Sequence, residues 1–156
     1  MKKYLNSISD FAYKFATFFN LGAQKSADIF IAICTLPLCF IFINCSETFK
    51  FIIFLLILMF SSFCTYVAVK REGIDNSHNI VCNELWGMLL TSYMADSWFQ
   101  PFVGFFIYRF ICMILQFLKD ILIVKYKTFE VLILDTAYKG FIAMMILWFI
   151  KKYLLF

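Results

Sequence analysis

The chain has 156 residues, of which 63% are hydrophobic and 15% are charged. An ordinary soluble domain is about half apolar and about a quarter charged, so both values argue against a water-soluble globule. The net charge of +4 would suit nucleic acid, but the basic residues lie between apolar runs and no nucleic-acid-binding module is recognised. The composition instead indicates one membrane domain, residues 1–156, with its basic residues at the membrane surfaces.

The first predicted element is residues 1–26, an N-terminal helix lying at the membrane interface. Its aromatic residues recur at roughly helical spacing among mixed charges, a pattern typical of a helix on a membrane surface. The segment lacks the pattern of a cleavable signal. We therefore expect the first apolar run to remain as a membrane helix and residues 27–156 to form a helix bundle.

Five apolar runs follow, at 28–45, 51–69, 80–95, 102–124 and 129–150. A spanning helix needs about 20 mostly apolar residues, so the run at 80–95 is the weakest candidate. A polar turn is expected at 46–48, and a break near 119–120. The sequence predicts an all-α, polytopic membrane helix bundle of about four to five hydrophobic helices.

The positions of the basic residues predict the orientation of this bundle. Placing the N-terminus in the cytoplasm puts most lysines and arginines on that side, although Lys50, Lys151 and Lys152 fall outside if all five helices cross. The six cysteines mostly lie inside apolar runs and form no CxxC pair. They are expected to be small buried hydrophobes rather than disulfides or metal ligands.

The informative ionisable residues inside the apolar runs are Glu84, Arg109, Asp135 and Lys139. A charge at the bilayer centre costs about 2.5–3.5 kcal/mol, so such groups face a bundle interior and indicate a functional site. Structural alternatives stay open. Asp135 and Lys139 are four apart and can neutralise each other, Glu84 can favour a helix dipole, and Arg109 can pair with an acid purely for folding.

Three segments carry a family resemblance. Residues 80–88 read Ile-Val-Cys-Asn-Glu-Leu-Trp-Gly-Met and resemble the signature of the bacterial phosphatidylglycerophosphatase A family: Ile-Val, a variable residue, Asp-Glu, two more residues and Gly-Met. Residues 104–110, which include Arg109, resemble the family's next block. Residues 132–140, with Asp135, Thr136 and Gly140, resemble its Asp-Asp segment and following glycine. The resemblance covers about residues 60–150.

The resemblance implies an enzyme of phospholipid biosynthesis in the bacterial inner membrane. Such an enzyme removes the terminal phosphate of phosphatidylglycerophosphate, an anionic phospholipid, to give phosphatidylglycerol. It implies catalysis by Glu84, Asp135 and Arg109. The two carboxylates would hold Mg²⁺ and Arg109 would bind the phosphate. Asn83 and Thr136 would hydrogen-bond a water on the metal.

Several family acids are replaced, because Asn83 and Thr136 stand where the family has aspartates. Glu72 or Asp75 could supply the missing carboxylates. Two alternatives therefore stay open. One is a non-catalytic relative that acts as a membrane lipid- or protein-binding component. The other is a small transporter component with Arg109 and Lys139 lining a pore, against which stands the lack of paired Gly/Pro-broken helices.

Overall fold

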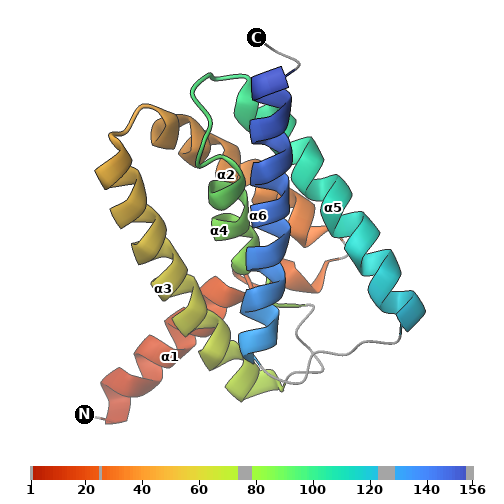
Figure 1. Ribbon diagram of the computed structural model, residues 1–156. Helices are drawn as coiled ribbons and strands as arrows, with labels where there is room; N and C mark the ends of the chain where they lie inside the picture. The colour runs from red at the N-terminus through yellow and green to blue at the C-terminus, as the bar shows by residue number, and fades with distance from the viewer. Residues whose placement is uncertain (1, 25, 74–78, 123–128, 154–156) are drawn as a thin grey trace.

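The computed structural model describes residues 2–24, 26–73, 79–122 and 129–153, and all regular structure within these ranges is helical (Figure 1). The all-α class is therefore confirmed for this part of the chain. The elements in order are α1 (Lys2–Ala16), the 3-10 turn η1 (Leu21–Ala23), α2 (Ala27–Ile43), α3 (Glu47–Glu72), α4 (Asn83–Thr91), α5 (Gln100–Leu122) and α6 (Phe129–Tyr153).

Three of these helices, α3, α5 and α6, are long and apolar enough to cross a membrane. The segment from α3 is the most apolar, with a mean hydropathy of 2.5. Helix α2 has 17 residues, somewhat fewer than the roughly 20 that a span needs. Helix α4 has only nine and is well short of that length. The described residues thus contain three candidate spans, where the sequence predicts four to five hydrophobic helices.

Three helix boundaries differ from the sequence prediction. The expected turn at 46–48 is wrong, because α3 already begins at Glu47, whose carboxylate suits the positive end of the helix dipole. Helix α4 begins only at Asn83, since the amides of Val81 and Cys82 donate to the carbonyl of Ala16. The expected break near 119–120 is also wrong, because α5 continues to Leu122.

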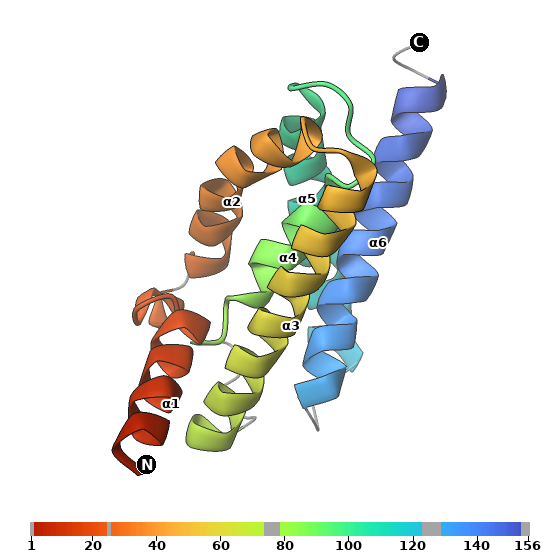
Figure 2. The same ribbon diagram turned by 90° about the vertical axis from the view of Figure 1, so that its left-hand side faces the viewer.

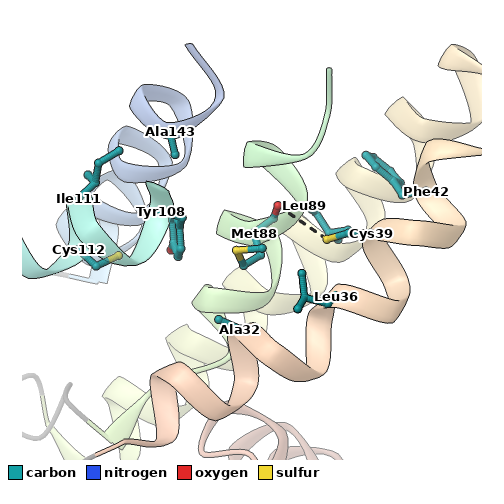
Figure 3. Close-up of a cluster of buried hydrophobic side chains, with 10 residues drawn as sticks. All are labelled: Ala32, Leu36, Cys39, Phe42, Met88, Leu89, Tyr108, Ile111, Cys112 and Ala143. Carbon is teal, nitrogen blue, oxygen red and sulfur yellow. Dashed lines mark hydrogen bonds between the residues drawn. The ribbon is translucent and has the colours of Figure 1, made fainter. Parts of the chain in front are cut away.

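Helix α4 lies at the centre of the bundle, in contact with α2, α3, α5 and α6 (Figures 1 and 2). Its side chains Trp86, Met88 and Leu89 are at most 1% exposed. Figure 3 shows Met88 and Leu89 between the buried residues of α2 and those of α5 and α6. Other helices therefore enclose α4, and its side chains contact protein.

Two glycines allow α4 to approach its neighbours closely. A Cβ atom added to Gly140 of α6 would lie 2.9 Å from the carbonyl oxygen of Gly87 in α4. A Cβ atom on Gly87 would overlap the hydroxyl of Tyr108, which belongs to α5. The absence of side chains at these two positions therefore sets the separation of α4 from α5 and α6.

The long helices expose large apolar side chains on their outer faces. Met59 of α3, Phe106 of α5 and Leu134 of α6 are each between 65% and 69% exposed, and only 22% of the apolar segment of α3 is buried. Soluble monomers rarely expose apolar patches of such extent. This outer surface suits contact with the acyl chains of a membrane.

The cysteines divide by position. Cys39, Cys64, Cys82 and Cys112 are buried, as expected of small hydrophobes. Cys34 is exposed on α2, so the prediction is wrong for that residue, and Cys45 is only partly buried.

Four polar side chains join α1 to the end of α3, and we call them the α1–α3 cluster: Asp10, Tyr13, Arg71 and Glu72. Arg71 Nη1 lies 2.7 Å from Asp10 Oδ1, and its guanidinium lies 4.4 Å from the centroid of the Tyr13 ring. The Tyr13 hydroxyl donates a hydrogen bond to Glu72. This bond, followed by burial, raises the pKa of Tyr13, because the phenolate would lose the bond and be repelled by the carboxylate.

Candidate functional site

A cavity of about 850 Å³ lies where η1 and the first turn of α2 face α4, α5 and α6. It is lined by the start of α4, by α5 from its middle onward, and by the first half of α6. All five residues that the family resemblance assigns to the site line this cavity: Asn83, Glu84, Arg109, Asp135 and Thr136. They come from three different helices, so tertiary packing rather than local sequence brings them together.

Arg109 is the central cation of the cavity, and its side chain is 18% exposed. It forms an ion pair with Asp28, and its Nη1 lies 3.4 Å from Glu84 Oε2. The planar guanidinium can serve two carboxylates because it carries five donors in a fixed fork. Asp28 was not among the predicted site residues. The available signal was a lone carboxylate at the start of an apolar run.

Asp135 and Lys139 form a further ion pair of the cavity, separate from those of Arg109. They are four residues apart on α6, with Lys139 Nζ 2.6 Å from Asp135 Oδ2, and their side chains are 12% and 11% exposed. The pairing predicted from their spacing is therefore present. Lys139 also lines the cavity, so its ammonium group is available to a ligand there as well as to Asp135.

Asn83 turns its oxygen away from the cavity's charged groups and toward α3. Its Oδ1 lies within hydrogen-bond distance of Ser61 Oγ at 3.1 Å, Thr65 Oγ1 at 2.9 Å and Trp86 Nε1 at 3.4 Å. The indole nitrogen can only donate, so it fixes which end of the amide is the oxygen. The buried Nδ2 of Asn83 has no hydrogen-bond partner in the described part of the chain.

Thr136 is 4% exposed, and its hydroxyl donates to the carbonyl oxygen of Leu132 one turn earlier on the same helix. Glu72 belongs to the α1–α3 cluster and also accepts a hydrogen bond from Asn79, and it does not line the 850 Å³ cavity. Asp75, the other expected substitute acid, lies outside the described residues. Glu72 therefore does not supply a carboxylate to this cavity.

A magnesium ion takes oxygen ligands, usually one or two carboxylates together with waters and substrate phosphate. Among the described residues, no three His, Cys, Asp or Glu side chains come together as a metal site. Glu84 faces Arg109, and Asp135 faces Lys139, so cations already stand beside both expected ligands. Glu84 and Asp135, each beside a cation, therefore do not fit a resident magnesium site. Magnesium dependence stays a prediction of the family resemblance.

Comparison of the chain with protein-family models, with curated proteins and with solved structures finds no match. The resemblance of residues 80–88, 104–110 and 132–140 to the phosphatidylglycerophosphatase A family therefore stays a prediction. The geometry described above is independent of that resemblance. It consists of a large cavity inside a helical bundle, lined by three carboxylates and two cations.

Proposed function

We propose that this chain is a membrane phosphatase that hydrolyses a phosphate monoester carried by a lipid. The substrate on this proposal is phosphatidylglycerophosphate and the product phosphatidylglycerol, as the resemblance implies. The observation that supports it is the meeting of Glu84, Arg109 and Asp135 at one cavity. Carboxylates and a guanidinium are the groups that such a hydrolysis uses for proton transfer and for phosphate binding.

The chemistry assigned to these residues is general base catalysis. Glu84 or Asp135 accepts a proton from the attacking water as the water oxygen bonds to phosphorus. The bond from phosphorus to the ester oxygen breaks, and the carboxylic acid returns the proton to that oxygen, which leaves as the lipid hydroxyl. Arg109 binds the phosphoryl oxygens and neutralises the charge that develops on them.

The proposed setting is the bacterial inner membrane with the N-terminus in the cytoplasm. Helix α1 exposes Ile8 and Phe11, each 55% exposed, and we place this apolar face in the membrane interface. The basic end of α3, with Lys70 and Arg71 in its last turn, lies beside α1 (Figure 2). An anionic cytoplasmic leaflet would attract these charges.

A second candidate is a non-catalytic relative that binds anionic lipid. The observation that favours it is the pairing of the cavity's acids with Arg109 and Lys139, because a paired carboxylate is a weaker base. In that case the cavity would hold a phosphate headgroup without turning it over. The two candidates share the ligand and differ in the reaction.

The test is phosphate release from phosphatidylglycerophosphate by detergent-purified protein, with added magnesium and, separately, with a chelator. The control is the double variant Glu84→Gln/Asp135→Asn, which keeps the shape of both side chains and removes their capacity as a base. Release by the wild type well above this control supports the phosphatase. Binding of the lipid without release by folded protein overturns the phosphatase in favour of the second candidate.

A further inference from the structure

We propose that the cavity binds a phosphate monoester directly through protein donors, Asn83, Arg109 and Lys139, with no bridging metal ion, and that the phosphate displaces Asp28 from Arg109. This inference rests on the proposed function for the identity of the ligand class. It adds two residues, Asp28 and Lys139, to the site, and it changes the role expected for Asn83 from that of an acceptor to that of a donor.

The side chain of Asn83 is the first reason. Its oxygen is occupied by the polar groups of α3 and by Trp86, and the residue is 3% exposed. What remains is a buried N–H₂ group that has no hydrogen-bond partner among the described residues, at a residue that lines the cavity. A buried unpaired donor is costly, and an anionic oxygen would satisfy it, whereas a metal ion or its water hydrogens would not.

The second reason is that the donors come from three helices around the same space. Asn83 begins α4, Arg109 lies in α5 and Lys139 in α6, and all three line the cavity. The amino end of α4 adds the positive end of a helix dipole. A guanidinium, an ammonium and an amide from different directions can contact separate oxygens of one phosphate.

Binding of an anionic phosphate requires that one carboxylate move away from the cations of the cavity. The cavity lining carries Asp28, Glu84 and Asp135 against two cations, which leaves a formal charge of −1. The side chain of Asp28 is 40% exposed, whereas those of Glu84 and Asp135 are 15% and 12% exposed. Asp28 can therefore turn into solvent at the smallest desolvation cost, and the incoming phosphate replaces it on Arg109.

The ligand could be free phosphate or a phosphate carried by a lipid, since both present the same oxygens. Two apolar side chains of α5, Met113 and Phe117, line the cavity and are 62% and 65% exposed. They connect the polar interior with the apolar outer face of the bundle. This continuity favours a ligand with an acyl chain, and the experiment includes both sources.

The experiment measures equilibrium binding to the full chain in nanodiscs or detergent, with chelator present throughout. The probes are a short-chain phosphatidic acid, inorganic phosphate and a neutral phosphodiester lipid. The variants are Asp28→Asn, Asn83→Asp and Lys139→Ala. The matched control is Lys50→Ala, because Lys50 is also a buried lysine paired within its own helix, with Glu47 at 2.9 Å, but does not line the cavity.

We expect phosphatidic acid to bind in chelator and the neutral lipid not to bind. Asp28→Asn should tighten binding about tenfold, the size of one charge-assisted hydrogen bond, because it removes the competing anion. Asn83→Asp and Lys139→Ala should weaken binding about tenfold or more, and Lys50→Ala should leave it unchanged. Comparable binding of inorganic phosphate would assign the site to the free ion instead of a lipid, and would leave the direct protein donors in place.

Two results would overturn the inference. The first is phosphate binding that requires magnesium and is weakened by Asp28→Asn, since loss of a carboxylate weakens a metal-mediated contact. The second is equal affinity in Lys139→Ala, Asn83→Asp and wild type. Failure of the proposed function looks different, because metal-free binding without any phosphate release would refute the hydrolysis and support this mode of recognition.

Discussion

The α1–α3 cluster and the cavity use the same kinds of side chain in opposite surroundings. In the α1–α3 cluster, Arg71 is 50% exposed and its partner Asp10 is 59% exposed. In the cavity, Arg109 is 18% exposed and Glu84 15%. An exposed ion pair contributes about 0–1 kcal/mol, whereas buried charges pay a large desolvation penalty. Charges at the margin of this bundle thus serve helix packing, whereas buried charges that line the cavity are candidates for binding or catalysis.

The largest effect is expected when acids of the two regions are replaced one at a time. Glu84→Gln and Asp135→Asn should each reduce phosphate release by about 100-fold or more, because general acid–base groups contribute on the order of 10²–10⁴ in rate. Asp10→Asn should retain nearly wild-type release. Steady-state assays on phosphatidylglycerophosphate provide the measurement. Equal rates for all three variants would remove the distinction between the regions.

A smaller effect is expected when each arginine is replaced by lysine. Arg109→Lys should raise KM about tenfold with a lesser change in kcat, because an ammonium cannot make the bidentate contact of a guanidinium. Arg71→Lys should change neither constant, since Arg71 contacts Asp10 and Tyr13 rather than the cavity. An unchanged KM in the Arg109→Lys variant would contradict a role of Arg109 in binding phosphate.

Arg71→Ala tests the packing role of the α1–α3 cluster. It removes the pair with Asp10 and the contact with the Tyr13 ring, for a loss of about 1 kcal/mol or less in stability. Thermal unfolding in detergent at two salt concentrations would measure it, with a smaller loss expected at high salt. A loss of phosphate release in the folded variant would show that this cluster acts on the reaction.

The smallest effect is a dependence on pH confined to alkaline conditions. The pKa of Tyr13 is raised in the folded chain above its ordinary value of about 10. The hydrogen bond to Glu72 therefore stabilises the fold fully below about pH 10 and is lost as pH rises through the folded-state pKa. The difference in melting temperature between wild type and Tyr13→Phe should be constant from pH 7 to 9 and shrink above 10. A difference that shrank below pH 8 would contradict the assignment.

The sequence predicted helical structure well, because apolar runs of this length leave few other ways to satisfy the backbone. It also singled out Glu84, Arg109 and Asp135, since charge inside an apolar run is costly, and the structure brings these three to one cavity. It did not predict Asp28, which lies 81 residues from its partner Arg109. Such a pairing depends on how the helices pack.

The orientation of Asn83 was equally out of reach. The sequence alone offers an amide that can accept or donate, and the structural choice is made by Trp86, whose indole nitrogen can only donate. The boundary at Glu47 could have been found, because a serine followed by an acid is a usual start for a helix. The nine-residue length of α4 could not, since the amides before it bond to α1.

The close approach of Gly87 and Gly140 has a consequence for how this site can change. The 2.9 Å separation that a Cβ on Gly140 would have from the Gly87 carbonyl means that main chain, not side chains, spaces α4 from α6. A Cβ on Gly22 of η1 would likewise overlap the carbonyl of Asn79. The backbones of α4 and α6 therefore fix one wall of the cavity. Thr136 packs into the same contact, since its Cγ2 would lie 2.9 Å from a Cβ atom on Gly87, so a larger side chain at position 136 would press on α4.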